Sequence, residues 1–171
     1  SHSAFARRQA QERSDAEYAA ALRQAPPKQD STYEQLLALD KRGDYRAMLA
    51  LTGEAENADP DSARLLRGAH AALATEAERG GDFDTALMHM ESAMVLQPLS
   101  DDPLLARSAE LRGKLSASWY RKGTQLINSD LSGAIEALEK SVEYNPYNDN
   151  ARRKLDQAQT LQRNLERIEK R

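Results

Sequence analysis

Apolar side chains recur along most of this chain at intervals of three and four residues, the period of an amphipathic α-helix. The spacing is clearest in residues 62–79, where Leu65, Leu66, Ala69, Leu73 and Ala77 share one face. Val and Ile, which favour strands, are rare, whereas Ala, Leu, Glu, Arg, Lys and Gln dominate. The pattern therefore predicts an all-α fold.

The helical stretches end at a repeated arrangement of turn-forming residues. Seventeen residues separate Gly43 from Pro60, and 17 again separate Gly81 from Pro98. A third stretch, residues 130–146, also ends in a proline. In all three stretches a polar residue precedes it: Asp59-Pro60, Gln97-Pro98 and Asn145-Pro146. A fixed interval between a turn and a terminating proline indicates a helix–turn–helix unit that has been copied. Such units bury their apolar faces only by stacking on one another, so we expect a right-handed solenoid of helical hairpins.

The breakers divide the chain into a leading segment and a repeat domain. Residues 1–29 are predicted to form a loosely attached helix, 4–24, followed by a Pro-rich linker at 25–29. Residues 30–171 are predicted to form the domain, with repeats at 30–61, 62–100 and 101–147 and a capping helix at 148–171. Ser1–Ser3 resemble a cloning remnant.

The third repeat is longer than the second. Pro98 and Pro146 are 48 residues apart, against 38 between Pro60 and Pro98. After Asp102-Pro103, an N-cap followed by proline at the first helical position, no breaker occurs before Asn128. The sequence therefore predicts a first helix of about 26 residues in this repeat, about 39 Å long.

Charge is unevenly distributed along the chain. Residues 31–150 hold twelve Lys/Arg and twenty Asp/Glu, whereas residues 151–171 hold seven Lys/Arg and three Asp/Glu. The last helix carries a nearly heptad-spaced apolar stripe: Leu155, Ala158, Leu161, Leu165 and Ile168. This stripe either folds back on the third repeat as a cap or pairs with another copy as a short coiled coil.

Catalytic and metal-binding patterns are absent from the sequence. There is no cysteine, no phosphate-binding glycine loop and no pair of His residues at helical ligand spacing. His70 is expected to fill a helix–helix contact, and His89 to face solvent. We therefore expect no enzyme, no cofactor and no metal.

The basic tail has no interleaved aromatic residues, so we expect no nucleic-acid partner. No apolar run of the sequence is long enough for direct membrane insertion.

The spacing of the repeats resembles that of the tetratricopeptide repeat family. Trp119, Gly123, Ala134 and Pro146 occupy the Trp, Gly, Ala and Pro places of the family pattern in the third repeat. The departures there are Lys122 for Leu and Leu126 for Tyr. The second repeat matches at Gly81, Asp82, Phe83, Ala86, Ala93 and Pro98, with His70 at the Trp place and Ala74 at the Gly place. The resemblance covers residues 30–171.

The resemblance implies a non-catalytic adaptor that binds a protein or peptide segment in a concave groove. The groove positions of the family correspond here to Tyr33, Leu37, Ala71, Thr75, Tyr120, Thr124 and Ile127, with Asn128 near the rim. Tyr33 and Tyr120 could instead pack against neighbouring helices as core. The Lys and Asn positions that clamp a chaperone tail in some family members are not matched.

The alternative function is a structural homo-oligomerisation module of a larger envelope assembly that uses the C-terminal helix, so we expect a monomer or a weak homodimer.

The Ala/Arg-rich composition and the Pro-rich spacer resemble those of bacterial tetratricopeptide proteins of the cell envelope. Such proteins often hang from a lipid anchor as lipoproteins and organise periplasmic complexes. The resemblance therefore implies a periplasmic location, with the cytoplasm as the alternative.

Overall fold

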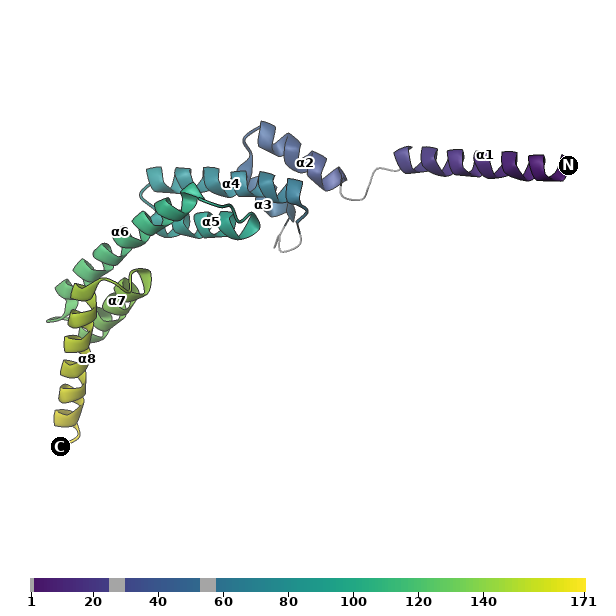
Figure 1. Ribbon diagram of the computed structural model, residues 1–171. Coiled ribbons are helices and arrows are strands. Elements are labelled where there is room, and N and C mark those ends of the chain that lie inside the picture. Colours follow the sequence, from purple (N-terminus) through teal and green to yellow (C-terminus); the bar gives the residue numbers. More distant parts are fainter. Residues whose placement is uncertain (1, 25–29, 53–57) are drawn as a thin grey trace. The chain divides into compact units, whose positions relative to one another are not determined.

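Every element of the chain is a helix in the part that the computed structural model describes, residues 2–24, 30–52 and 58–171. The all-α prediction is confirmed for these residues. The helices are α1 (His2–Gln24), α2 (Asp30–Lys41), α3 (Tyr45–Thr52), α4 (Pro60–Arg79), α5 (Phe83–Leu96), α6 (Pro103–Leu126), α7 (Leu131–Tyr144) and α8 (Asp149–Glu169) (Figure 1). The predicted linker at 25–29 lies outside the described residues, as do residues 53–57 of the predicted first repeat.

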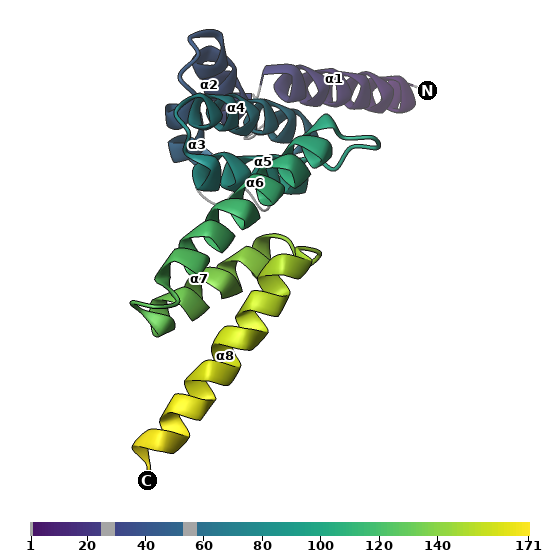
Figure 2. The same ribbon diagram turned by 90° about the vertical axis from the view of Figure 1, so that its left-hand side faces the viewer.

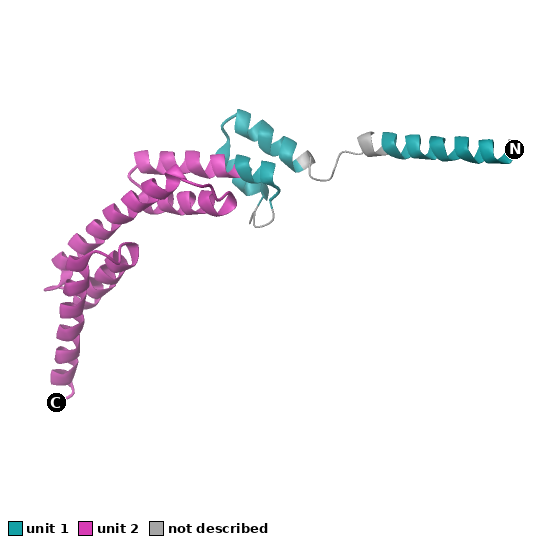
Figure 3. Cartoon of the chain, in the orientation of Figure 1, with its two compact units in different colours: residues 1–65 teal, residues 66–171 magenta. Residues whose placement is uncertain are grey.

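The chain divides into two compact units, Ser1–Leu65 and Leu66–Arg171, with the boundary inside α4 (Figure 3). In the first unit, α2 packs against α3. The side chains of residues 3–18 in α1 are all exposed. The second unit holds most of α4 and all of α5 to α8, and it contains the features that bear on function.

Two of the turns between helices are built from the same glycine–aspartate pair. After α2, Gly43 N–H donates to the carbonyl of Asp40, and Asp44 N–H donates to that of Leu39. After α4, the same two bonds run from Gly81 to Glu78 and from Asp82 to Ala77. Both glycines have positive φ, 69° and 76°, which is the left-handed helix ending that glycine adopts without strain.

Aspartate then starts the next helix in each hairpin. The Asp82 carboxylate accepts a hydrogen bond from Thr85 N–H at 3.2 Å and caps α5. The Asp44 carboxylate accepts one from Ala47 N–H at 3.3 Å. Aspartate is a strong N-cap because its oxygen satisfies a backbone donor that the helix leaves unpaired. These two aspartates therefore set the starts of α3 and α5.

The long helix α6 joins two clusters of apolar side chains in the second unit. Its first half packs with α4 and α5, in a cluster that contains Ala74, Ala86, Met90, Ala93, Leu104 and Leu111. Its second half lies beside α7, where Ile135 and Leu138 pack with Ala158 of α8. The helix is 24 residues long, close to the predicted 26, and it begins as predicted with the Asp102 cap and Pro103.

The α6–α7 contact combines a close backbone approach with a buried polar pair. A Cβ on Gly123 would lie 2.7 Å from Cγ of Leu138, so only glycine fits there without displacement. Ser116 and Ser141 are fully buried, and each hydroxyl donates to the other residue's carbonyl at 2.7 Å. The Asn148 amide donates to the Ser116 hydroxyl at 3.0 Å, which ties the start of α8 to the same pair.

A buried ion pair fixes the beginning of α6 to α4. The Arg67 guanidinium donates to both carboxylate oxygens of Asp102, at 2.6 and 2.9 Å, and to the carbonyl of Gln97 at 3.1 Å. The two side chains are only 11% and 7% exposed. The hydrogen bond from Arg67 is the main cause that lowers the pKa of Asp102, so this carboxylate stays charged at neutral pH.

Candidate functional site

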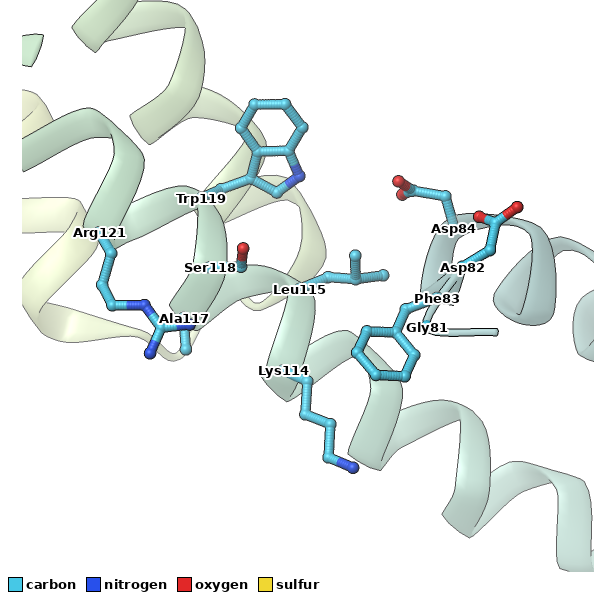
Figure 4. Close-up of a pocket in the computed structure, with 10 residues that line it drawn as sticks. All are labelled: Gly81, Asp82, Phe83, Asp84, Lys114, Leu115, Ala117, Ser118, Trp119 and Arg121. Atoms are coloured by element: carbon cyan, nitrogen blue, oxygen red, sulfur yellow. The ribbon is translucent and has the colours of Figure 1, made fainter. Parts of the chain in front are cut away.

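A trough runs along α6 in the second unit, where the end of α4 and the start of α5 face the middle of α6. Its larger part has a volume of about 610 Å³ and lies between Gly81–Asp84 and Lys114–Arg121 (Figure 4). A smaller part of about 280 Å³ adjoins it at Phe83 and Lys114 and continues to Arg107 and Glu78. We call the two parts together the α6 trough.

The α6 trough lies where the helices that pack against α6 change. The first half of α6 packs with α5 and the second half with α7, so the two hairpins are set apart along one rod. Of the ten additional residues in the Pro98–Pro146 interval, four lengthen the helix, by about 6 Å, since α6 has 24 residues and α4 has 20. Trp119 and Leu115 reach the trough from α6, and Asp82 and Asp84 lie across it (Figure 4).

The α6 trough is mainly basic along α6, where Glu110 is the one acidic lining residue, and acidic on the opposite side. Arg107, Lys114 and Arg121 follow one another at seven-residue spacing, which keeps them on one stripe of α6. The opposite side carries three carboxylates, those of Glu78, Asp82 and Asp84. Arg107 Nη2 already lies 3.4 Å from Glu78, and Lys114 Nζ lies 5.5 Å above the Phe83 ring. An occupant therefore meets charges of both signs along apolar surface.

Two contacts order the acidic side. Hydrogen bonds from the side chain and backbone of Thr85 lower the pKa of Asp82, which holds it ionised. The Tyr144 hydroxyl of α7 donates to the Asp84 carboxylate. That hydrogen bond is the largest of the causes that raise the pKa of Tyr144 to about 12, so the phenol remains a donor at neutral pH. The start of α5 is thereby tied to the end of α7.

Trp119, at the Trp place of the family pattern, borders the α6 trough and is half-buried. Two ammonium groups lie over its ring: Lys122 Nζ is 4.8 Å from the ring centroid, and Lys140 Nζ of α7 is 4.3 Å from it. Such contacts are favourable because the ring face is electron-rich. The indole is thus held in place at the edge of the trough by α6 and α7 together.

The predicted groove residues of the second unit lie on α4, on α6 and in the turn after α6, and none of them is among the residues that line the α6 trough. Thr75 is half-buried, donates to the carbonyl of Ala71 and accepts a weak 3.5 Å contact from Arg107. Thr124 is half-buried and bonds to the carbonyl of Arg121. With Ala117 and Arg121 it falls on one face of α6, at helical intervals of four and three, and the exposed Asn128 follows in the α6–α7 turn. Ala71 and Ile127, the latter at the C-cap of α6, are half-buried.

Tyr120 has a different environment from the other predicted residues. It packs against the apolar cluster of Ile135, Leu138 and Ala158 and is half-buried. Of the two alternatives in the sequence, Tyr120 therefore contributes at least partly to the core. Substituting it would disturb packing as well as any bound segment, so Ala117 and Arg121 are better positions at which to examine the trough.

Tyr33 and Leu37 belong to the first unit and are half-buried on α2. The hollow between α2 and α3, about 530 Å³, is lined by other residues of the two helices: Gln35, Ala38, Leu39, Arg42, Ala47, Ala50 and Leu51. The two predicted residues therefore lie outside this hollow.

Sequence reasoning missed a pair of histidines. His89 was expected to face solvent, but it is half-buried, and its Nδ1 lies 2.9 Å from Nδ1 of His70 across α4 and α5. Burial, and secondarily the charge of His89, lower the pKa of His70. The two histidines are 19 residues apart in the sequence, and this spacing does not predict a contact. The contact depends on the axial register between α4 and α5. Among the described residues, no group of three or more His, Asp or Glu is arranged to hold a metal ion.

The chain matches no protein-family model and no curated protein. Within the described residues, no helix is both long and apolar enough to cross a membrane.

Proposed function

We propose that this chain is a non-catalytic scaffold of tetratricopeptide-like hairpins that binds a peptide segment of a partner protein along α6. The observation that carries this proposal is the α6 trough, an open space of several hundred Å³ with apolar surface flanked by charges of both signs. This site differs from the predicted groove, since it is lined by residues of α5, α6 and the end of α4 and by none of the predicted groove positions.

The lining suits an extended or helical segment with one apolar anchor. Phe83 and Trp119, both half-buried, offer apolar surface, and aromatic side chains supply much contact area at little entropic cost. Basic Arg121 and acidic Asp82 can then pair with opposite charges on either side of the anchor, which fixes the direction of the bound segment.

Selection of displayed peptides tests this proposal. A library of random twelve-residue peptides is selected on the 171-residue chain, and binding of the enriched peptides is measured by calorimetry. Ala117→Arg places a long side chain in the trough from an exposed position of α6, so we expect about a ten-fold or greater loss of affinity.

Ala109→Arg is the matched control, because Ala109 is exposed on the same helix but does not line the trough. Its affinity should equal that of the unchanged chain. Circular dichroism checks that both variants keep their helices. Peptides that bind the Ala117→Arg and Ala109→Arg variants equally well would show that the trough is not the binding site.

The compartment is part of the same proposal. The composition resembles that of envelope tetratricopeptide proteins, which supports a periplasmic location for the scaffold, with the cytoplasm as the alternative. Fractionation of the native cells with an antibody against the chain separates the two: a periplasmic or membrane-attached pool is expected, and a purely cytoplasmic pool would overturn this part.

A further inference from the structure

The outer half of α8 carries an apolar row that is largely exposed. Leu161, Leu165 and Ile168 are 42%, 46% and 68% exposed. The inner half is different, since Ala158 is buried and Leu155 packs with it on α7. Figures 1 and 2 both show the C-terminal part of α8 continuing beyond α7. All residues from Arg163 to Arg171 are exposed.

The row has the spacing of a coiled-coil seam. Leu161, Leu165 and Ile168 are separated by four and three residues, and Ala158 precedes Leu161 by three. Alternating intervals of three and four place side chains on one narrow stripe of a helix, which a second helix can cover along its length. The stripe is thus shaped for a helix rather than for an irregular segment.

The two flanks of the row carry opposite charges. At 100° per residue, Glu166 and Glu169 fall on one side of the row, and Arg167 and Arg171 fall on the other. Arg163 and Lys170 point to the back of the helix by the same geometry. A partner helix of uniform charge would be repelled along one flank. A helix with one acidic and one basic flank is attracted along both if it runs in the same direction.

We propose that the outer half of α8 binds the same segment of a second copy of this chain, with the two helices parallel. In a parallel pair the acidic flank of each helix faces the basic flank of the other, and the three apolar residues meet their own counterparts. In an antiparallel pair like flanks would face each other, acidic against acidic and basic against basic. The pairing is separate from the α6 trough, and it makes the scaffold bivalent.

The molecular mass in solution tests the pairing. Light scattering of the full chain across a dilution series should move from twice the 19.0 kDa chain mass towards a single chain mass. Leu165→Glu with Ile168→Glu puts charge into the seam at exposed positions and should weaken dimerisation about a hundred-fold. Arg163→Gln with Lys170→Gln changes the net charge equally on the back of the helix and should leave the dimer intact. A chain that is monomeric at all concentrations, or a dimer that tolerates the glutamates, overturns the proposal.

Cross-linking tests the direction of the helices. The chain has no cysteine, so a single introduced thiol reports one position at a time. Leu161→Cys and Ile168→Cys should each form a disulfide-linked dimer on mild oxidation, because a parallel pair brings both positions opposite themselves. Arg163→Cys on the back should not. An antiparallel pair can link a position to itself only near its centre, so a dimer linked through one of the two seam positions alone would contradict the parallel arrangement.

Discussion

The α4–α5 and α6–α7 hairpins reverse the chain in the same way but are held together by different contacts. Between α4 and α5 the turn uses Gly81 at positive φ, and the helices meet through small apolar residues and the His70–His89 pair. The α6–α7 turn contains no positive-φ residue, and its helices meet through Gly123 and a buried serine pair. The comparison shows that the repeated sequence signals determine where helices start and stop, while each hairpin has its own solution for the contact between its helices.

The largest expected effect comes from breaking the close approach in the α6–α7 hairpin. Gly123→Ala forces a Cβ against Leu138, which is fully buried and closely packed, so we expect a loss of about 1–3 kcal/mol in the free energy of unfolding. Gly113→Ala is the control in the same helix, where an added Cβ has no neighbour within 4 Å. It should stabilise by up to about 1 kcal/mol, because alanine favours helix. Urea denaturation measures both. If Gly123→Ala and Gly113→Ala changed the free energy of unfolding equally, then α6 and α7 could move apart at Gly123 without cost, contrary to this prediction.

A smaller effect is expected at the glycine turns. Gly43→Ala and Gly81→Ala each place a side chain at positive φ, which costs about 1–2 kcal/mol. The two losses should be similar if the turn chemistry alone decides them. Asn128→Ala in the α6–α7 turn is the contrast, since this residue does not have positive φ and is exposed. Its unfolding free energy should change little. A loss at Asn128 as large as that at Gly81 would remove the distinction between the turns.

The smallest effect is a pH dependence confined to the α4–α5 hairpin. The folded-state pKa of His70 lies below its ordinary 6.5, so the unfolded chain binds more protons there than the folded chain. Its contribution to stability is present above pH 6.5 and is lost as pH falls through the window between 6.5 and the lowered pKa. Asp82 and Asp102 have lowered pKa values, so their contributions are lost only below the carboxylate range, at more acidic pH.

Urea midpoints at pH 7.5 and 5.5 measure this dependence. The unchanged chain should be less stable at pH 5.5, and His70→Gln should reduce the difference between the two values. An identical pH difference in the His70→Gln variant would assign the effect to other groups.

Helix boundaries could be predicted from the sequence because short-range chemistry sets them. Asp102-Pro103 starts α6, and Gly81-Asp82 separates α4 from α5. The stacking of the predicted repeats into a solenoid remains a proposal. Contacts between helices were harder to predict. The His70–His89 pair and the approach of Gly123 to Leu138 depend on axial register, which periodicity does not specify.

The sequence contains one indication of the α6 trough, the greater length of the third repeat. Only the length of a helix was predicted from it. The ten additional residues between Pro98 and Pro146 were assigned to a longer helix, but only four of them lengthen it, since α6 has 24 residues and α4 has 20, and five precede α6 at 98–102. The trough itself could not be predicted, because it depends on which half of α6 packs with which neighbouring helix. Tyr120 illustrates the same limit. The resemblance to the family places it in the groove, whereas in the structure it packs against apolar side chains of α7 and α8.

Trp119 gives this molecule an optical reporter at its proposed binding surface. It is the sole tryptophan of the chain, so all indole emission arises from the edge of the α6 trough. The two ammonium groups over its ring make that emission sensitive to any acidic group that draws them away. Occupancy of the trough can therefore be followed in the unlabelled protein by spectral shift and quenching, in competition formats and at low concentrations.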